Sequence, residues 1–564
     1  MVKRTSSSLI LVFAIFWGAA SEALAQGDRG RVVGVITDST GGILPKALIS
    51  ALNLATGFRT RAVSGDSGVY VLPYLPAGTF RITAQLSGFK THVRGRVIVP
   101  VGQTVRQDIR LEVGEISQHV EVTPDELLQT ETSTVSTVVS NEQIAELPLN
   151  GRSFTELTLL VPGAVPNPNP TFLTRGTNVS VSGNRSENNN FTLDGITNNE
   201  TFFKQFGVQP SLDAIQEFVI QTNVSSAEFG SAAGSQVNVA TKSGSSIFHG
   251  SLFEFARNDV FDARDTFARE KPDFRQDQFG GTLSGPLDLR SARSARRLAF
   301  FMVNYEGFRF RRVSNIYSTV PTAAMLAGDL SLDVTGLPAP PIYDPATTRP
   351  DPAHPGGWIR DAFPGNRIPR NRLDTIAGLW VQRFLPAPNL PGRAANFLNT
   401  RPGRNDSDQF TARVDYEFGE RNTLFGRFSY VDSQALRPGP LPAVDNTLGN
   451  FFRNLVLSDT HVLNSTMTLD VRLGYHRNNL RVADSAPGGL QGALDFLRTT
   501  GIQGVTVKSQ EIPLYPQVNV AGLFGINQSG FPFPDDTYQA VASLSRAQAR
   551  HFLKMGMDLQ HRRN

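Results

Sequence analysis

The sequence has 564 residues, of which 40% are hydrophobic and 18% are charged, and its formal net charge at pH 7 is +4. This length exceeds one ordinary domain and predicts about two to four folded units. The absence of cysteine excludes a disulfide scaffold, thiolate metal sites and a cysteine nucleophile, and the weak, scattered positive charge argues against a nucleic-acid partner.

Residues 1–25 have the pattern of a secretory signal peptide. Lys3 and Arg4 supply positive charge, a short apolar run follows, and Ala23-Leu24-Ala25 is a small-residue cleavage motif. We expect cleavage between Ala25 and Gln26. A membrane-anchoring helix is the alternative, but the apolar run is too short to span a bilayer. Since no later stretch reaches about 18 consecutive apolar residues, the exported chain is predicted to be periplasmic, secreted or an outer-membrane β-barrel.

Residues 26–115 are predicted to form a β-sandwich. Strand-like runs are separated by turn signals at regular spacing, such as Thr40-Gly41-Gly42 and Leu75-Pro76-Ala77-Gly78. The five predicted strands are Arg31–Thr37, Ala47–Asn53, Val69–Leu72, Phe80–Leu86 and Val105–Leu111.

The order of glycines, prolines and aromatic residues in this segment resembles the carboxypeptidase regulatory-like domain. The residues that carry the resemblance are Gly34, Ile36, Asp38, Gly41, Leu44, Pro45, Ala47, Gly68, Tyr70, Leu75 to Phe80 and Gly88 to Lys90. The resemblance implies an immunoglobulin-like fold that is related in shape to carbohydrate-binding modules. It does not imply peptidase activity.

Residues 116–246 are rich in Ser, Thr, Asn, Gln and Gly, with short apolar runs between them. Thr134–Gly151 and Ser211–Val219 are predicted to be helical or mixed, and Phe218–Thr222 and Gln236–Thr241 to be strands. Four phrases resemble the plug domain of TonB-dependent receptors, in particular the Oar-like subgroup. They are Leu147–Arg152, Phe191–Gly195, Val237–Gly244 and Phe248–Ser251. The resemblance implies an α+β plug domain that sits inside a barrel and blocks its channel.

Residues 247–564 alternate between apolar and polar with a period of two. In Asp408–Phe418 every second residue from Phe410 is apolar, whereas Arg413 and Asp415 belong to the polar set between them. A soluble sandwich can show the same alternation. Segments of about 10 residues with aromatic residues near their ends favour an antiparallel transmembrane β-barrel. About nine strands are predicted, around 248–258, 276–287, 298–311, 408–419, 422–433, 452–464, 466–479, 537–545 and 550–562.

The segments 312–407 and 482–535 are predicted to be long extracellular loops. Transporter barrels of this kind have about 22 strands, and an open sheet edge in lipid leaves backbone groups unpaired. The sequence therefore predicts a partial barrel, from a chain truncated at its C-terminus. A small closed barrel is the alternative.

The motifs that would support catalysis are weak, and the sequence predicts that the chain is not an enzyme. Gly65-Asp66-Ser67-Gly68 resembles the surroundings of a serine nucleophile, but the first histidine, His92, follows it, so a hairpin turn is predicted. Asn405-Asp406-Ser407-Asp408 is predicted to be a polar turn rather than a calcium loop. No zinc or nucleotide motif occurs, and no cofactor or metal is expected.

The family resemblance implies a receptor in the bacterial outer membrane that takes up an extracellular ligand, such as a siderophore, a glycan or a peptide. The implied partners are outer-membrane lipid and a TonB-type inner-membrane protein that supplies energy. The alternative function is cell-surface adhesion or carbohydrate binding through the N-terminal sandwich.

The candidate energy-coupling segment is the extended run His119, Val120, Glu121, Val122 and Thr123. Such a segment would pair with its partner by strand addition. It departs from the usual box, which begins with Asp-Thr. A last sandwich strand or a linker is the alternative interpretation.

Overall fold

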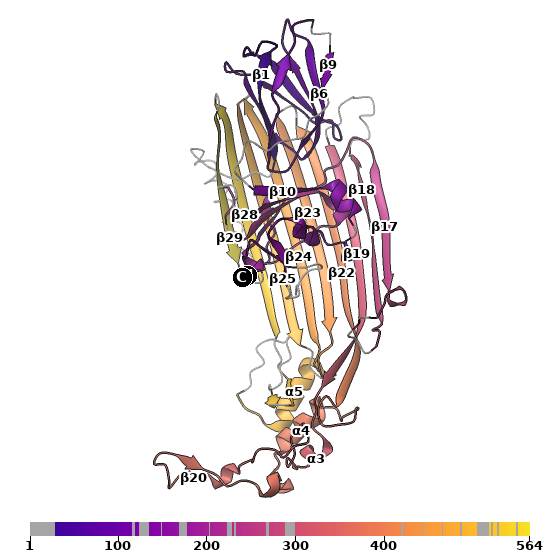
Figure 1. The fold of residues 1–564 in the computed structure, drawn as a ribbon, viewed down its shortest axis with the longest axis vertical. Coiled ribbons are helices and arrows are strands. Elements are labelled where there is room, and N and C mark those ends of the chain that lie inside the picture. The colour runs from indigo at the N-terminus through magenta and orange to yellow at the C-terminus, as the bar shows by residue number, and fades with distance from the viewer. Residues whose placement is uncertain are drawn as a thin grey trace, which may run out of the picture.

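The computed structural model contains three β-rich units and a group of loops (Figure 1). The first unit lies at one end of the long sheet of the third, the second lies against that sheet, and the loops lie at its other end. The structure describes residues 29–115, 119–122, 135–147, 149–167, 178–201, 204–222, 228–230, 233–264, 266, 270–287, 299–418, 421–442, 444–464, 466–484, 488–504, 518–520, 523–526, 530–548 and 551–563. The predicted signal peptide, with its cleavage residues Ala25 and Gln26, lies outside the described residues.

The N-terminal unit is a sandwich of two sheets. The first sheet contains β4 (Val69–Leu75), β1 (Gly30–Asp38), β7 (Thr104–Arg106) and β8 (Ile109–Leu111). The second has the order β3 (Arg59–Val63), β2 (Leu48–Asn53), β5 (Gly78–Gln85), β6 (Thr91–Val99) and β9 (His119–Val122). Strands β3 and β6 were not among the predicted strands, because charged residues interrupt their apolar positions.

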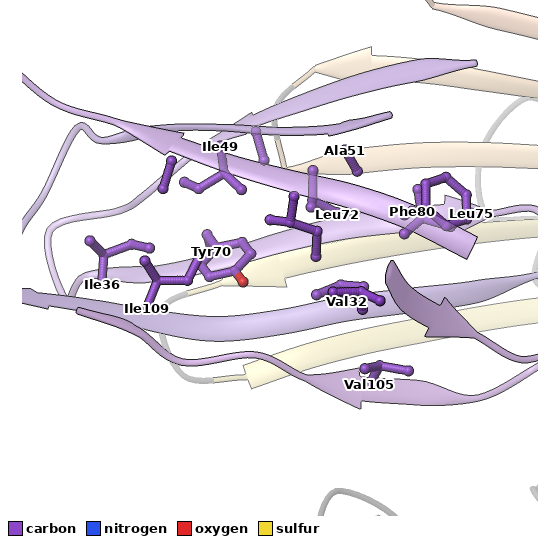
Figure 2. Close-up of a cluster of buried hydrophobic side chains, with 14 of the residues drawn as sticks. Val32, Ile36, Ile49, Ala51, Tyr70, Leu72, Leu75, Phe80, Val105 and Ile109 are labelled. Atoms are coloured by element: carbon purple, nitrogen blue, oxygen red, sulfur yellow. The ribbon is translucent and has the colours of Figure 1, made fainter. Parts of the chain in front are cut away.

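The sandwich core is built from the buried half of each alternating strand. Val32, Ile36, Ile49 and Phe80 are fully buried between the sheets (Figure 2). Tyr70 also lies in this core, where its hydroxyl donates to the Gln107 carbonyl over 2.6 Å. Burying large apolar side chains is the main stabilising contribution in such a unit.

The Gly65-Asp66-Ser67-Gly68 segment is a turn, as predicted, but it is not a hairpin. It connects β3 to β4, which belong to different sheets. Gly68 has a φ of +70°, and a Cβ atom there would lie 2.8 Å from the Ile36 carbonyl oxygen. Glycine is therefore needed at this position for backbone geometry and close packing.

The second unit has a five-stranded sheet with short helices packed against it. Its strand order is β10 (Val135–Ser140), β15 (Ile215–Thr222), β16 (Ser235–Thr241), β13 (Asn190–Leu193) and β14 (Ile196–Thr197). The helical elements include α2 (Asn141–Glu146), η2 (Phe154–Leu160) and η4 (Leu212–Ala214). The two segments predicted to be helical or mixed are thus mixed, with strand and helix in each.

The third unit is one curved antiparallel sheet in which each strand pairs with its neighbours in chain order. Its nine strands in the described chain are β17 (His249–Asn258), β18 (Phe274–Pro286), β19 (Ala299–Ser318), β22 (Phe397–Phe418), β23 (Asn422–Arg437), β24 (Asn446–Asn464), β25 (Met467–Asp484), β28 (Gly530–Gln548) and β29 (His551–Arg563). The predicted partial barrel of nine strands is confirmed. Of the described helices, none is both long and apolar enough to cross a membrane.

The two faces of this sheet differ in polarity, as the alternation predicts. On β24, Leu455 and Leu457 are 36% and 53% exposed, whereas the flanking Asn454 and Ser458 are buried on the face that holds the second unit. A transmembrane barrel has this arrangement, with an apolar outer wall and a polar lumen. Asn405–Asp408 forms part of β22, so the predicted polar turn is wrong.

The ends of the sheet differ in the length of their connections. Three residues join β22 to β23 and two join β24 to β25, whereas at the opposite end residues 319–396 separate β19 from β22 and residues 485–529 separate β25 from β28. Short connections are typical of the periplasmic side. The sandwich lies at the short-connection end, and α4 (Thr375–Phe384) and α5 (Gly489–Thr500) lie at the other (Figure 1).

The long loops are folded against one another. Trp380 and Phe384 of α4 stack with ring centroids 4.9 Å apart. They share a buried cluster with Leu441 and with Phe496 of α5, so three separate loops contribute to one small core. The loops are shorter than predicted because β19, β22 and β28 continue beyond the alternating segments.

Candidate functional site: the contact between the second unit and the barrel wall

A two-residue turn brings the second unit against the barrel wall. Asp194 and Gly195 connect β13 to β14, with Leu193 paired to Ile196, and both turn residues have positive φ, +50° and +78°. An Asp-Gly pair with two positive φ values is the preferred sequence for a type I′ hairpin turn. The local sequence thus fixes a sharp tip, and this tip carries a carboxylate.

The Asp194 carboxylate lies in a buried network of opposite charges. Arg427 donates through Nε to Oδ2 over 2.6 Å, and Arg413 donates through Nη1 to Oδ1 over 3.2 Å. Thr241 adds its backbone N–H and its hydroxyl, each at 2.9 Å. Arg413 also binds Asp415 over 2.8 Å. Two arginines therefore face two aspartates, so the charges of this network balance.

Burial alone would raise the pKa of Asp194, because a buried carboxylate is poorly solvated. The guanidinium groups of Arg427 and Arg413 and the hydrogen bonds from Thr241 outweigh that effect and hold the pKa below its ordinary value. The side chain of Asp194 is only 2% exposed. The group is therefore a charged carboxylate that depends on the barrel arginines for its stability.

Gly195 lets the barrel wall approach the turn closely. A Cβ atom at this position would lie 1.5 Å from Nη1 of Arg472, which is fully buried beside Asp470. Next to it, Ile196 packs against Gly474, where an added Cβ would meet Ile196 atoms at 3.0 Å. A glycine on each side of the contact, Gly195 in the second unit and Gly474 in the barrel wall, thus allows the two units to approach closely.

Further polar contacts link the second unit to the last strands of the sheet. The Thr197 amide donates to Gln539 Oε1 over 2.8 Å. Lys554 of β29 forms an ion pair with Glu228. The interface therefore combines hydrogen bonds and ion pairs with apolar contacts, in which Ile196 packs against Phe425 and Val456 and the core of the second unit packs against Phe452.

The sandwich also contacts the other two units. The hydroxyl of Tyr74 lies 2.9 Å from Ser543 Oγ and 2.7 Å from Ser545 Oγ on β28. The Val101 amide donates to the carboxylate of Glu217 on β15. Burial raises the pKa of Glu217 to about 7, although the Val101 hydrogen bond opposes that shift.

The candidate energy-coupling segment lies in the sandwich. His119–Val122 form β9, which pairs in parallel with β6 at the end of the second sheet. Thr123 lies outside the described residues. The described part of the segment is therefore a strand of the sandwich, which was the alternative interpretation. Its role in energy coupling stays a prediction.

The charge network is the part of the site that sequence reasoning missed. The phrase Phe191–Gly195 was identified by its resemblance, and Arg413 and Asp415 were assigned to a polar strand face. The contact between these residues could not be inferred, because neither pattern indicates which side chain the other will contact. No group of three His, Cys, Asp or Glu side chains that could hold a metal occurs within the part of the chain that the structure describes.

The fold and these contacts define an outer-membrane β-barrel with a plug in its lumen. The profile of the outer membrane beta barrel domain matches residues 240–564, that of the TonB-dependent receptor plug domain matches 128–236, and that of the carboxypeptidase regulatory-like domain matches 31–112. The chain therefore belongs to the outer-membrane β-barrel family, as a TonB-dependent receptor with an N-terminal regulatory-like domain.

Among curated proteins, the chain is 25% identical over 302 residues to the TonB-dependent transporter Oar of Myxococcus xanthus. The match covers 50% of this chain and 27% of that protein. A solved ferric enterobactin receptor mutant of Pseudomonas aeruginosa is 12% identical, with a TM-score of 0.41 over 76% of this chain and 49% of its own. The outer membrane transporter YddB of Escherichia coli is 10% identical, with a TM-score of 0.39 over 76% and 56%. The chain thus spans about a quarter of the curated relative and about half of these solved proteins.

Proposed function

We propose that this receptor takes up a ligand across the outer membrane, and that movement of the plug opens its lumen. The observation that supports this is the polar contact of Asp194 with Arg413 and Arg427. Water can replace hydrogen bonds and ion pairs when such a contact opens. Opening an apolar core instead exposes apolar surface to water, at a free-energy cost of about 25 cal/mol per Å². A plug held in this way can be released and can return.

Energy for the movement would come from a TonB-type inner-membrane protein that pulls on the segment from His119 to Thr123. Strand β9 is the last strand in its sheet order, so strand addition by a partner along its outer edge is geometrically reasonable. The segment also lies in the sandwich, at the short-connection end of the barrel (Figure 1). A pull on this segment would act on the side of the plug where Val101 of the sandwich contacts Glu217.

The ligand would enter from the opposite end, where the folded loops lie, and it would be a siderophore, a glycan or a peptide. The protein would bind and move this ligand without changing it, so we assign no catalytic role. The alternative of adhesion through the sandwich receives less support, because the Tyr74 side of the sandwich is occupied by the barrel wall. The domains are proposed to be 26–115, 116–246 and 247–564, after a signal peptide at 1–25.

The plug can be fixed to the wall to test this proposal. Glu228 and Lys554 form an ion pair across the contact, and the native chain has no cysteine, so Glu228→Cys with Lys554→Cys offers one defined pair of thiols. Cells would be given a labelled ferric catecholate, a labelled oligosaccharide or a labelled peptide as the probe. We expect partner-dependent uptake of one probe, and its loss when a bis-maleimide joins the two thiols.

Each single-cysteine variant is the matched control and should keep uptake after the same treatment. A reducible cross-linker should restore uptake after reduction. Uptake that continues with the plug fixed, or that needs no inner-membrane partner, would contradict the proposal.

A further inference from the structure

The plug contacts the loop half of the barrel wall through a short hairpin of its own. The two arms of this hairpin, residues 198–201 and 204–207, are joined by main-chain hydrogen bonds, among them that from the Gly207 amide to the Asn198 carbonyl over 2.7 Å. The Asn198 side chain adds two hydrogen bonds to the main chain of Val208. We call the two arms the plug hairpin. Because they are bonded to each other, they can move as one body.

The plug hairpin covers a polar part of the wall on β25 and β28. Gly207 lies against His476, since a Cβ atom added to Gly207 would be 2.6 Å from Cε1 of the histidine ring. Glu200 accepts a hydrogen bond from Asn478 Nδ2 over 3.3 Å. Asp535 lies directly opposite Asn478 in the sheet. The three wall residues are buried, and they lie in the halves of their strands that are nearer the long loops.

These three wall residues lack hydrogen bonds that buried polar atoms need. His476 Nε2, Asn478 Oδ1 and both carboxylate oxygens of Asp535 are enclosed and have no hydrogen-bond partner in the described chain. The carboxylate is the costliest of them, because Asp535 is only 4% exposed and a buried charge without a partner is poorly stabilised. With the plug in place, the wall therefore retains unused acceptors for hydrogen-bond donors.

The plug hairpin carries a cation of its own near these acceptors. The charge of Lys204 is attracted by Glu200 and Asp535 and repelled by Arg562 of β29. Arg562 also acts on the charge of Asp535. Neither cation donates a hydrogen bond to Asp535, whose two oxygens are both unpaired. Lys204 thus balances part of the negative charge from a distance, and a cation in contact with Asp535 would be attracted more strongly.

A primary ammonium group has the chemistry that these acceptors require. It is compact, it carries a full positive charge, and it has three N–H donors. It would donate to the Asp535 carboxylate and to Asn478 Oδ1 at the same time, and the charged hydrogen bond is the stronger of the two. An anionic ferric catecholate would be repelled by Asp535, and a neutral oligosaccharide would leave the carboxylate without a countercharge.

We propose that a primary ammonium group of the transported ligand binds Asp535 and Asn478 when the plug hairpin lifts from β25 and β28, and that it replaces the charge of Lys204. The proposal rests on the uptake function proposed above and narrows the ligand to one that carries amines. A peptide with lysine residues and an oligomer of amino sugars both carry this group, and the experiment separates them.

The test measures binding to the full chain, extracted from outer membranes in mild detergent, by fluorescence anisotropy. The probes are a labelled lysine peptide and a labelled chitosan oligosaccharide, each with its N-acetylated form as the paired control. We expect at least one amine probe to bind, and its acetylated form to bind at least about tenfold more weakly. The affinities of the two amine probes then identify the source of the ammonium group.

Two substitutions should change this affinity in opposite directions. Asp535→Asn keeps the shape of the side chain but removes its charge, and it should weaken binding of the amine probe by at least about tenfold. Lys204→Gln removes the competing cation and should strengthen binding. The matched control is Asp536→Asn, because Asp536 is the next residue of the same strand but accepts from the Tyr475 hydroxyl on the outer face of the wall. This control should bind like the native chain.

A thiol measures the lifting of the plug hairpin without any ligand. The native chain has no cysteine, so Asn478→Cys places a single thiol beneath the hairpin. We expect this thiol to react slowly with a maleimide added to intact cells. Adding Gly207→Ala should make the reaction at least about tenfold faster, because the new Cβ would meet the His476 ring and hold the hairpin away from the wall. Heat-modifiable mobility on gels would show that each variant is folded.

Equal affinity for the amine and acetylated probes would overturn the proposal, as would native affinity in the Asp535→Asn variant. A thiol at position 478 that reacts as fast with Gly207 in place as without it would show that the hairpin does not cover the site. If amines do not bind but uptake of another probe is blocked by the cross-link between positions 228 and 554, this subsite is wrong and the uptake function stands. If amines bind but uptake continues with the plug fixed, the subsite stands and the uptake function is wrong.

Discussion

At the residue scale, Asp194 is the group on which the plug contact most depends, because it compensates two buried guanidinium groups at once. Replacing it by asparagine keeps the shape but leaves Arg413 and Arg427 short of one negative charge. Removing one partner of a buried ion pair costs about 3–5 kcal/mol. We therefore expect Asp194→Asn to loosen the plug, seen as a higher ion conductance of the protein in planar bilayers.

Asp213→Asn is the matched control for this change. Asp213 pairs with Arg152 within the plug, and its side chain is 26% exposed, so water can replace the lost interaction. The conductance of this variant should stay close to that of the native chain. Equal conductance of the Asp194 variant and the native chain would show that the network does not hold the plug.

The pH dependence of sandwich docking rests on Glu217. Burial raises the pKa of this acid from an ordinary value of about 4.5 to about 7, so the docked state binds the proton more tightly than an undocked state would. Docking is then strongest below pH 4.5 and weakens as the pH rises through 7. Between pH 6 and pH 8 the docking equilibrium should fall by about tenfold.

Cross-linking measures this effect directly. Gln103 of the sandwich donates to Ser136 of the plug over 3.3 Å, so cysteines at these two positions report docking. The initial rate of bis-maleimide cross-linking, corrected for thiol ionisation with a model thiol, should fall with rising pH. Glu217→Gln in the same background should remove most of the dependence. A rate that falls equally in both proteins would refute the assignment to Glu217.

Sequence reasoning reached part of the plug contact but not its arrangement. Asp194 was identified only within a family-like phrase and Arg413 only on a polar strand face, and Arg427 was not singled out. Asp194 lies 219 and 233 residues from Arg413 and Arg427, and a period of two cannot tell which charged residues on a polar face will meet. Only the curvature of the sheet around the plug brings these groups together.

At the element scale, each barrel strand has one apolar and one polar face. A substitution that introduces one charged side chain on the apolar face tests this difference. Leu457 points outward from the middle of β24 and is 53% exposed. Leu457→Arg would place a cation in lipid, at a cost of about 2–4 kcal/mol near the bilayer centre. We expect less folded protein in the outer membrane, measured as the fraction with heat-modifiable mobility after urea titration.

Tyr317→Arg provides the comparison, because Tyr317 also points outward and is 46% exposed, but it lies near the loop end of β19. A charge near or beyond the interface costs about 0–1 kcal/mol. The two variants should therefore differ clearly in urea midpoint. Similar midpoints would mean that the outer face of β24 does not contact lipid.

The same alternation explains which strand boundaries could be predicted from the sequence. Each of the nine predicted strands exists, but β22 begins at Phe397 rather than near 408. Its first residues include Thr400, Arg401 and Arg404, which are polar on both faces because the strand has left the membrane there. Outside lipid, hydrogen bonding continues without any hydrophobic pattern, so the sequence carries no signal of the strand extension.

At the scale of the whole molecule, the sandwich is fixed to the barrel rather than tethered beside it. Arg31 of β1 lies over the ring of Phe552, 4.0 Å from its centroid. Tyr74 reaches Ser543 and Ser545 and has a φ of +56°, which is unfavourable for a side chain of this size. Such strain persists only where surrounding contacts maintain it. The sandwich and the plug would therefore respond together to the pull that we propose.

Tyr74→Phe tests whether this contact fixes the sandwich, because it removes the hydroxyl and keeps the ring. The two serine hydroxyls would lose their buried partner, at a cost of about 1–3 kcal/mol. In the Gln103→Cys, Ser136→Cys background, we expect slower cross-linking while the sandwich itself remains folded. Tyr70→Phe is the matched control, since its hydroxyl donates to the Gln107 carbonyl inside the sandwich core. That change should lower the thermal stability of the sandwich but leave the cross-linking rate unaltered below its melting temperature. If both variants cross-link at the native rate, the sandwich is held by its apolar contacts with the plug, and the hydroxyl of Tyr74 has no part in docking.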